Sequence, residues 1–375
     1  MALPVVLLAL VVIGALMAGA FFSATQEHHA GRSALDQRRA FQAAERGLAM
    51  MLTGWDSLVG DSAWALRRDG VPYTEHDEGT ITTTVLRPIT PLTYWITAEA
   101  VIGRGLPTET SRRVGALIRL EPPVLNVSGA VVLSGTGGVA ELGSALRVDG
   151  GSHVPSGWSD CLGDAPGAAG LVAGATAPWP STDTACATDC FAGDPPIQLG
   201  PGLDDSAAVA AELDHVWTAL APEVSITLPG GTVVGTPETP LGPREVNGRC
   251  DGGIATNWGD PGRSTACARY FPVILADGDL HVAGGAGQGV LLVNGDLTLS
   301  GGAIFAGLII VRGALRTLAP GPDVLGSVRV AGQNGARTSV TGGGRFEYSR
   351  CALRQSLAPH SPPHIEPGSW IELHR

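Results

Sequence analysis

The side chains with chemical potential in this sequence are aspartates at a regular spacing, cysteines and histidines. Asp279 and Asp296 lie 17 residues apart in two Gly-Asp-Leu words, so stacked strands would bring their carboxylates onto one face. Such carboxylates could bind calcium or act as the acids of a polysaccharide-cleaving β-helix enzyme. However, the calcium-binding nonapeptide GGxGxDxUx is absent, and Gly-Asp is common in turns. The simpler interpretation of both residues is a turn between strands.

The six cysteines could hold a metal or form disulfides, and they are Cys161, Cys186, Cys190, Cys250, Cys267 and Cys351. Cys186 and Cys190 have three residues between them, and no further Cys or His completes a zinc pattern. An even number of cysteines in an exported region favours disulfides. Proximity makes Cys186–Cys190 and Cys250–Cys267 reasonable pairs, although the sequence does not choose among the alternatives.

The histidines near the two ends of the chain are the remaining candidates for metal ligands. His28 and His29 follow an apolar stretch, and His360, His364 and His374 lie in a proline-rich tail. Exposed histidines are common near termini, so we predict no metal site at either group. The motifs GxSxG, HExxH and Gly-Lys-Ser/Thr are also absent. The sequence therefore predicts no catalytic, cofactor-binding or metal-binding residue, and the protein is not expected to be an enzyme.

The composition excludes one class of partner and favours one class of structure. A formal net charge of −11 argues against nucleic-acid binding, which needs clustered basic groups. The 53 glycines and 27 prolines favour turns and short strands over helical bundles.

The N-terminal stretch, residues 1–26, is predicted to span a membrane. Residues 2–26 carry no charged side chain, and as a helix they would cover roughly 36 Å, against about 30 Å of hydrocarbon. A cleaved secretory signal is the alternative, because Ala18-Gly19-Ala20 resembles a cleavage site. The absence of a basic region before the apolar run, and the length of that run, favour a retained anchor. The rest of the chain is then expected on the non-cytoplasmic side.

A helical pattern continues beyond the apolar stretch. Apolar residues recur at spacings of three and four, and no proline occurs between Val5 and Val71. The stripe consists of Phe41, Ala44, Leu48, Met51, Leu52 and Trp55. One long helix is therefore predicted, and its amphipathic second half must pack against another element. An anchor followed by a separate surface helix is the alternative.

The apolar N-terminus is followed by Arg38-Arg39-Ala40-Phe41-Gln42-Ala43-Ala44-Glu45. This arrangement resembles the start of PilX-type minor pilins of type IV pilus systems. The resemblance covers roughly residues 2–55. It implies a pilin fold, anchorage in the bacterial inner membrane, a periplasmic or extracellular C-terminal region, and entry into a pilus or pseudopilus. The implied partners are other pilin subunits and the pilus assembly machinery, with host or surface ligands in adhesion.

One departure from the pilin pattern concerns the leader peptide. Pilin precursors carry a basic leader ending in glycine, and Ala2-Leu3-Pro4-Val5 supplies no such cleavage site. We hypothesise that a leader is encoded upstream of Met1. Taken alone, Arg32, Arg38 and Arg39 would keep their side of the span cytoplasmic, and an upstream basic leader would resolve that conflict.

Three strand-like runs follow the helix, at residues 79–89, 93–102 and 111–120. They are rich in β-branched and aromatic residues and are separated by Pro/Gly turns. We predict a meander of antiparallel strands on which the helix packs, so that residues 27–121 form a pilin-like module. The same order is what the pilin resemblance implies.

A repeat dominates the C-terminal half. Gly278-Asp279-Leu280, Gly295-Asp296-Leu297 and Gly313-Ala314-Leu315 recur at intervals of 17 and 18 residues, each after an apolar strand. A unit of this length cannot bury its own apolar face, so stacked coils are expected. The pattern predicts a β-solenoid (β-helix-like) over residues 271–350, with its first part at 122–151; an antiparallel sandwich is the alternative.

Residues 152–270 interrupt this pattern and are predicted to form a loop-rich insertion with most of the cysteines. Asp204 or Asp205 could cap a helix there, with an apolar stripe of Val209, Leu213, Val216, Trp217 and Leu220. The insertion would offer a surface for partners, and residues 351–375 would form a tail.

The predicted fold is thus α+β: a pilin-like helix and antiparallel sheet, followed by a mainly-β solenoid domain. The predicted function is that of a minor pilin-like structural subunit, which acts in pilus assembly or adhesion through its surfaces. The alternatives are a type II secretion pseudopilus subunit and a membrane-tethered β-helix enzyme acting on polysaccharide.

Overall fold

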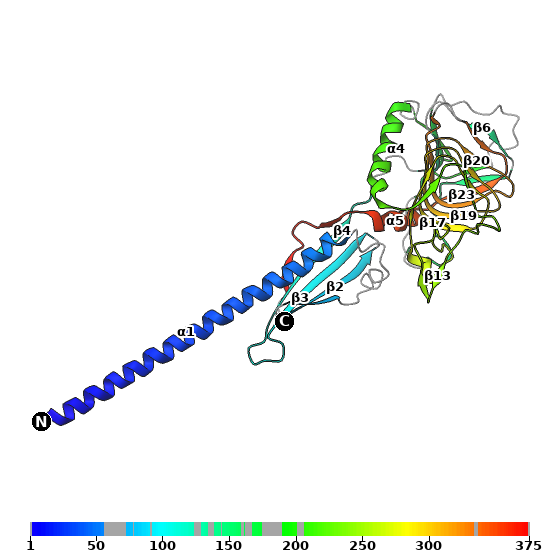
Figure 1. The fold of residues 1–375 in the computed structure, drawn as a ribbon. Helices are drawn as coiled ribbons and strands as arrows, with labels where there is room; N and C mark the ends of the chain where they lie inside the picture. The colour runs from blue at the N-terminus through cyan, green and yellow to red at the C-terminus, as the bar shows by residue number, and fades with distance from the viewer. Residues whose placement is uncertain are drawn as a thin grey trace.

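The computed structural model describes residues 2–55, 73–77, 79–90, 92–123, 129–133, 139–143, 145–158, 161, 167–174, 190–200, 206–333 and 337–373. One long helix leads into a small antiparallel sheet, and a larger, mostly β part lies beyond that sheet (Figure 1). We call residues 129–348 the β lobe, and α1 with the sheet of β1–β4 the helix–sheet module.

Helix α1 (Ala2–Thr53) is continuous, which confirms the prediction of a single long helix. Among its described side chains, none before Ala40 is buried. From there the buried positions are spaced by three and four residues, and they are Ala40, Ala44, Gly47, Leu48 and Met51. This spacing places them on one face of the helix, which is the face that packs against the sheet.

The sheet under α1 contains the three predicted strands. Strands β1 (Tyr73–Asp77), β2 (Thr80–Thr90), β3 (Thr93–Ile102) and β4 (Thr110–Leu120) pair antiparallel in that order. Alternate residues of β3 are fully buried, among them Ile96, Ala98 and Ala100. The small alanines let the helix lie close to the sheet, while Leu48, Met51 and Trp55 fill the remaining space.

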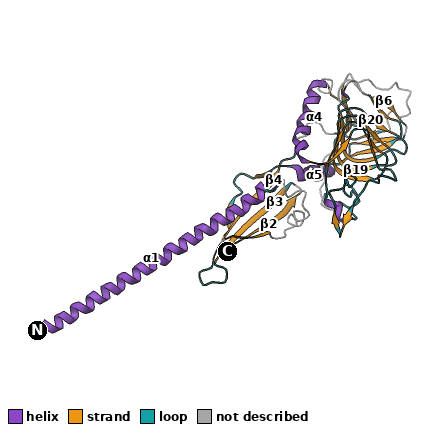
Figure 2. Ribbon diagram, in the orientation of Figure 1, coloured by secondary structure: helices purple, strands orange, loops and turns teal. Residues whose placement is uncertain are grey.

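The β lobe consists mainly of strands (Figure 2). Most of them form two sheets of parallel strands, and the chain alternates between these sheets. The first contains β15 (Val273–Asp277), β17 (Ala286–Val293), β19 (Ile304–Val311) and β21 (Asp323–Val330). The second contains β16 (Leu280–Val282), β18 (Leu297–Leu299), β20 (Leu315–Thr317) and β22 (Thr338–Val340). Val273 pairs with Val290, and Val290 pairs with Leu308, so equivalent residues of the repeat are neighbours. The apolar residues between the sheets form one core.

The assignment of residues 152–270 to an insertion needs correction, because this stretch contributes strands to the same sheets. Strands β11 (Val224–Pro229) and β12 (Thr232–Val234) pair parallel with β15 and β16. Strands β8 (Ala169–Gly174) and β10 (Ile197–Gly200) extend the first sheet at its other end. These strands are short and lack the Gly-Asp-Leu word, so the repeat did not indicate them. Their pairing partners supply the register instead.

The strands at residues 129–149 lie beside the last repeats rather than before the first. Strand β5 (Gly129–Leu133) pairs with β21, and β6 (Val139–Leu142) pairs with β22. Strands β7 (Leu146–Asp149), β9 (Phe191–Ala192) and β23 (Gly344–Tyr348) branch from β21. Chain order and spatial order therefore differ within the lobe.

The helix predicted in this region is α4 (Ser206–Leu220), followed by the 3-10 turn η2 (Ala221–Glu223). Its residues Leu213, Val216 and Leu220 are buried in the core of the lobe, as the apolar stripe predicts. The guanidinium of Arg312 stacks on the ring of Trp217 at 4.1 Å and bonds Asp214 at 2.6 Å. The proposed capping residues Asp204 and Asp205 lie outside the described residues.

The tail predicted at residues 351–375 is instead folded onto both parts of the molecule. Helix α5 (Arg350–Leu357) packs on β17, β19 and β21, and the turn η5 (Ala358–His360) follows. Strands β24 (Pro363–Ile365) and β25 (Ile371–Leu373) then pair antiparallel with β4. The β lobe is consequently inserted between two neighbouring strands of one sheet. Composition suggested a tail because the stretch is polar and rich in proline, whereas its strands are short and draw their stability from β4.

Two disulfides join described cysteines, Cys250–Cys267 and Cys161–Cys351. The first is one of the pairs that proximity favours, and the second links residues 190 positions apart. Cys190 is also disulfide-bonded, whereas Cys186, the partner that proximity makes reasonable, lies outside the described residues.

Candidate assembly surfaces

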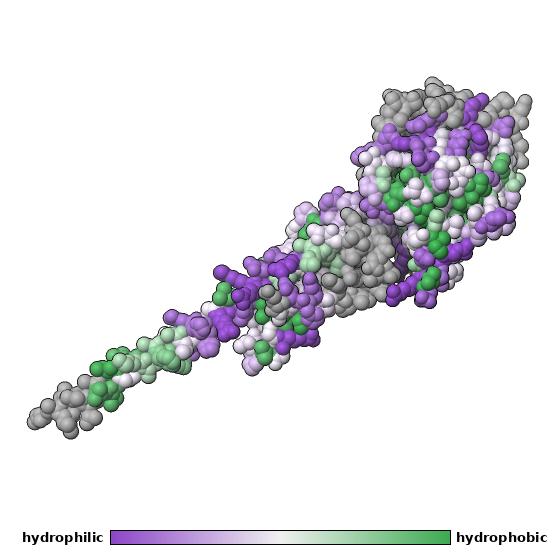
Figure 3. All heavy atoms as spheres, viewed as in Figure 1, coloured by the Kyte–Doolittle hydropathy of each residue, from purple (hydrophilic) through white to green (hydrophobic). Residues whose placement is uncertain are grey.

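The first half of α1 is an exposed apolar surface. Phe21 is 73% exposed and Leu16 is 68% exposed, and their neighbours are similar. This described stretch forms an apolar band, followed by polar residues before the sheet begins (Figure 3). By length and composition α1 could cross a membrane, with a mean hydropathy of 1.4 in its most apolar window. No other described helix meets those criteria. In water such a surface would be unfavourable, so it requires a bilayer or a protein partner.

The second half of α1 makes the helix–sheet contact. The Ala40–Glu45 segment lies at the start of this contact: Ala40 and Ala44 are fully buried, Phe41 is half-buried, and Glu45 is exposed. One turn later, Gly47 lies so close to β2 that a Cβ atom would be 2.6 Å from Cγ2 of Thr82. Small residues are therefore required on this face by the close approach of the helix backbone.

A shallow groove of about 320 Å³ lies between α1 and the β4–β25 edge of the sheet. Arg112 bridges its two walls, since its guanidinium donates to Gln37 at 2.8 Å and to Glu372 at 3.0 Å. The Phe41 ring meets Trp370 edge-on, with centroids 5.9 Å apart. The groove also includes Arg38, and these contacts attach the strap of residues 361–373 to the helix.

Asp279 and Asp296 cap successive turns of the stack. Oδ1 of Asp279 accepts the backbone N–H of Asp296 at 2.8 Å, and Oδ1 of Asp296 accepts that of Ala314 at 2.8 Å. Each carboxylate occupies space left by the glycine of the next repeat, because a Cβ on Gly295 or Gly313 would be 2.3 Å from it. The Gly-Asp-Leu word is thus explained as a unit: the glycine makes room for the preceding aspartate. This geometry assigns both carboxylates to turn capping.

The predicted histidines are distributed over different parts of the molecule. His28 and His29 are exposed on α1, and His364 lies on β24, 3.7 Å from Glu121. The side chain of His360 is 5% exposed, and its Nε2 bonds the carbonyl oxygen of Phe271 at 2.7 Å. His374 lies outside the described residues. Among the described His, Cys, Asp and Glu side chains, no group of three or more is arranged to hold a metal ion.

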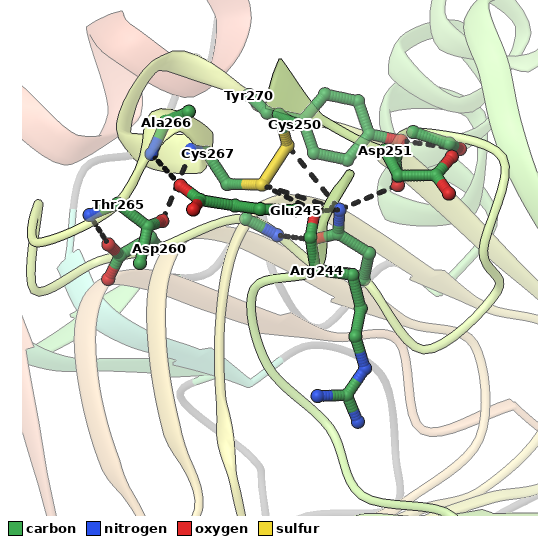
Figure 4. Close-up of a disulfide and its surroundings, with 12 residues drawn as sticks. Arg244, Glu245, Cys250, Asp251, Asp260, Thr265, Ala266, Cys267 and Tyr270 are labelled. Carbon is green, nitrogen blue, oxygen red and sulfur yellow. Dashed lines mark hydrogen bonds between the residues drawn. A yellow bond between two sulfur atoms is a disulfide. The ribbon is translucent and has the colours of Figure 1, made fainter. Parts of the chain in front are cut away.

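The loop that contains the Cys250–Cys267 disulfide is held by hydrogen bonds of polar side chains. Asn257 is fully buried, and its amide donates to the carbonyl oxygens of Asp251 at 2.7 Å and Arg244 at 3.2 Å. The Glu245 carboxylate accepts the N–H of Ala266 across the loop (Figure 4). These bonds anchor the base of the hairpin formed by β13 (Glu245–Val246) and β14 (Arg249–Cys250), next to the 3-10 turn η3 (Ala266–Arg269). Apart from the cysteine pair, the sequence pattern gives no sign of this network.

Asp260 organises the turn on the other side of this loop. Its carboxylate accepts the N–H of Ser264 at 2.7 Å. It also accepts the N–H of Thr265 at 2.7 Å (Figure 4). Burial by itself would raise the pKa of Asp260, but the hydrogen bonds from Thr265 and Ser264 outweigh burial and hold the pKa below its ordinary value. The carboxylate is consequently a structural anion that holds the turn.

Comparison with known proteins gives little likeness. No protein-family model matches this chain, and no curated protein matches it. Among solved structures it is similar to the crystal structure of the competence-associated pilin ComZ from Thermus thermophilus. The two chains share 10% sequence identity, with 90% of this chain and 96% of the pilin covered, at a TM-score of 0.22.

Proposed function

We propose that this protein is a minor pilin-like structural subunit of a type IV pilus or related filament, anchored in the bacterial inner membrane by α1. The observation that supports the proposal is that the two halves of one continuous helix have different surroundings. Its first half is apolar and exposed, while its second half is fixed to an antiparallel sheet through small residues. A helix of this kind can stand in a bilayer and later exchange lipid for other apolar helices without refolding.

The proposed role is assembly or adhesion through surfaces, with other pilin subunits and the assembly machinery as partners and a periplasmic or extracellular β lobe. We further propose that the β lobe is a β-solenoid, since its parallel strands alternate between two sheets at the spacing of the repeat. A catalytic role is not proposed, because the repeated aspartates already bind backbone N–H groups. No observation favours a type II secretion pseudopilus over a pilus.

Anchorage is tested by placing charges on the exposed apolar band. Val12→Arg with Leu16→Arg should release the chain from membranes during carbonate extraction, because each arginine costs about 2.5–3.5 kcal/mol at the centre of a span. Leu35→Arg is the matched control: Leu35 is 56% exposed on the same helix but lies beyond the predicted span. This control should remain in the membrane fraction.

Filament entry is tested in the same strains. Deletion of the gene should reduce surface pili, motility or adhesion, and sheared filaments from the wild type should contain the protein. Leu35→Arg should lower the amount in filaments, because packing against a neighbouring helix would bury this exposed leucine. If piliation, motility and adhesion are all unchanged by deletion, the proposed role is wrong.

A further inference from the structure

At the end of α5 the chain passes from the β lobe to the helix–sheet module with no intervening linker residue. Leu357 is buried in the core of the β lobe, and the next residue, Ala358, is 1% exposed in the core of the helix–sheet module. His360 then binds back to the lobe through the Phe271 carbonyl oxygen. Because these adjacent residues are packed in different cores, a displacement of α5 would also displace Ala358, which packs in the core of the helix–sheet module.

The strap of residues 361–373 completes the outer edge of β4. Besides the two short ladders, Glu366 donates its N–H to Leu117 at 2.8 Å, and Leu117 donates its N–H to Oγ of Ser369 at 3.1 Å. The Arg112–Glu372 pair and the Phe41–Trp370 contact add side-chain interactions. Without the strap, β4 would present an open edge and the groove would lose a wall.

The upstream end of the same segment is fixed to the β lobe. Helix α5 buries Ala352 and Leu353 against the lobe, and its Cys351 is joined to Cys161. The Ser349 hydroxyl caps the helix by accepting the N–H of Ala352 at 3.1 Å. Residues 349–373 thus bind the folded lobe with one end and β4 with the other.

We propose that residues 349–373 are a latch that makes the helix–sheet module depend on the folded β lobe. Among the residues that the structure describes, the outer edge of β4 is paired only by strands that follow the lobe in the chain, and α5 on the lobe sets their position. A subunit whose lobe is unfolded or lacks the Cys161–Cys351 bond therefore keeps an incomplete sheet beside α1. This coupling does not require the filament role, so the two proposals can fail separately.

Hydrogen exchange of the full chain in detergent, followed by mass spectrometry, tests the latch. Cys161→Ser with Cys351→Ser should speed exchange of the β4 amides at least about tenfold, while β17 and β19 stay protected. Cys250→Ser with Cys267→Ser is the matched control, since it removes a disulfide outside the latch; β4 exchange should stay unchanged.

Trp370→Ala with Glu372→Ala gives a second route to the same readout without touching the lobe. It should also speed β4 exchange and leave β17 and β19 protected, because it weakens only the strap. Unchanged β4 exchange in both latch variants would overturn the proposal. Equal acceleration in β4, β17 and β19 in both would also overturn it, because that result reports general destabilisation.

Discussion

Substitutions of Asp296 test whether its carboxylate caps a turn or binds calcium. Asp296→Ala removes the acceptor for the N–H of Ala314, a residue with no exposed surface. An unsatisfied buried N–H costs about 1–3 kcal/mol, and the ion pair to Arg316, 2.9 Å away and half-exposed, adds about 0–1 kcal/mol. Since Asp296 lies near the surface, water can replace part of the bond, and we expect a loss of about 2 kcal/mol.

Asp296→Asn keeps an oxygen at the capping position and should lose only about 0.5 kcal/mol. For a domain of this size, 1 kcal/mol lowers the melting temperature by about 2–4 °C. Calorimetry of the full chain in detergent should therefore show a decrease of about 4–8 °C for the alanine variant and about 1–2 °C for the asparagine variant.

The result that would refute the capping role is equal destabilisation by alanine and asparagine. A melting temperature of the wild type that rises with calcium, with the rise abolished in Asp296→Asn, would instead identify a calcium ligand. If Asp279 caps the previous turn, Asp279→Ala should likewise lower the melting temperature more than Asp279→Asn.

Three further predictions concern packing and pH. Gly307→Ala should destabilise the β lobe by about 3 kcal/mol or more, seen as loss of its calorimetric transition, because Gly307 has φ 143° and its Cβ would be 2.0 Å from the Gly289 carbonyl oxygen. Gly47→Ala should cost about 1 kcal/mol, since overpacking against Thr82 exceeds the gain in helix propensity, and Thr82→Ser should restore the melting temperature. Because folding lowers the pKa of Asp260, its ionised carboxylate stabilises the folded state at pH values above the ordinary carboxyl pKa. This stabilisation is lost as the pH falls through the lowered pKa. Asp260→Asn should therefore flatten the pH dependence of the melting temperature below about pH 4.

Several elements could be predicted from local pattern because their signals repeat over many residues. The 52-residue helix follows from an uncharged apolar run joined to a stripe at spacings of three and four. Strands β2–β4 follow from β-branched residues bounded by turns, and the burial of Leu213, Val216 and Leu220 follows from their spacing in α4. In each case the residues that make the element are close in sequence.

Other features have no local signal. Strands β11 and β12 lack the Gly-Asp-Leu word, and their place in the two sheets is set by pairing with β15 and β16. The polar network around Asn257 consists of bonds between side chains and distant carbonyls. The roles of Asp279 and Asp296 likewise became clear only when each carboxylate was placed beside the glycine of the next repeat.

Periodicity and turn chemistry act over neighbouring residues. The residue pattern alone therefore predicts the apolar helix, its amphipathic continuation, the antiparallel meander and the 17- and 18-residue repeat. The return of residues 363–373 to β4, the Cys161–Cys351 bond and the insertion of the β lobe in the small sheet are visible only in the folded chain. These contacts join residues more than a hundred positions apart. Their stability depends on the complementary edge or surface that the rest of the chain provides, which no local pattern records.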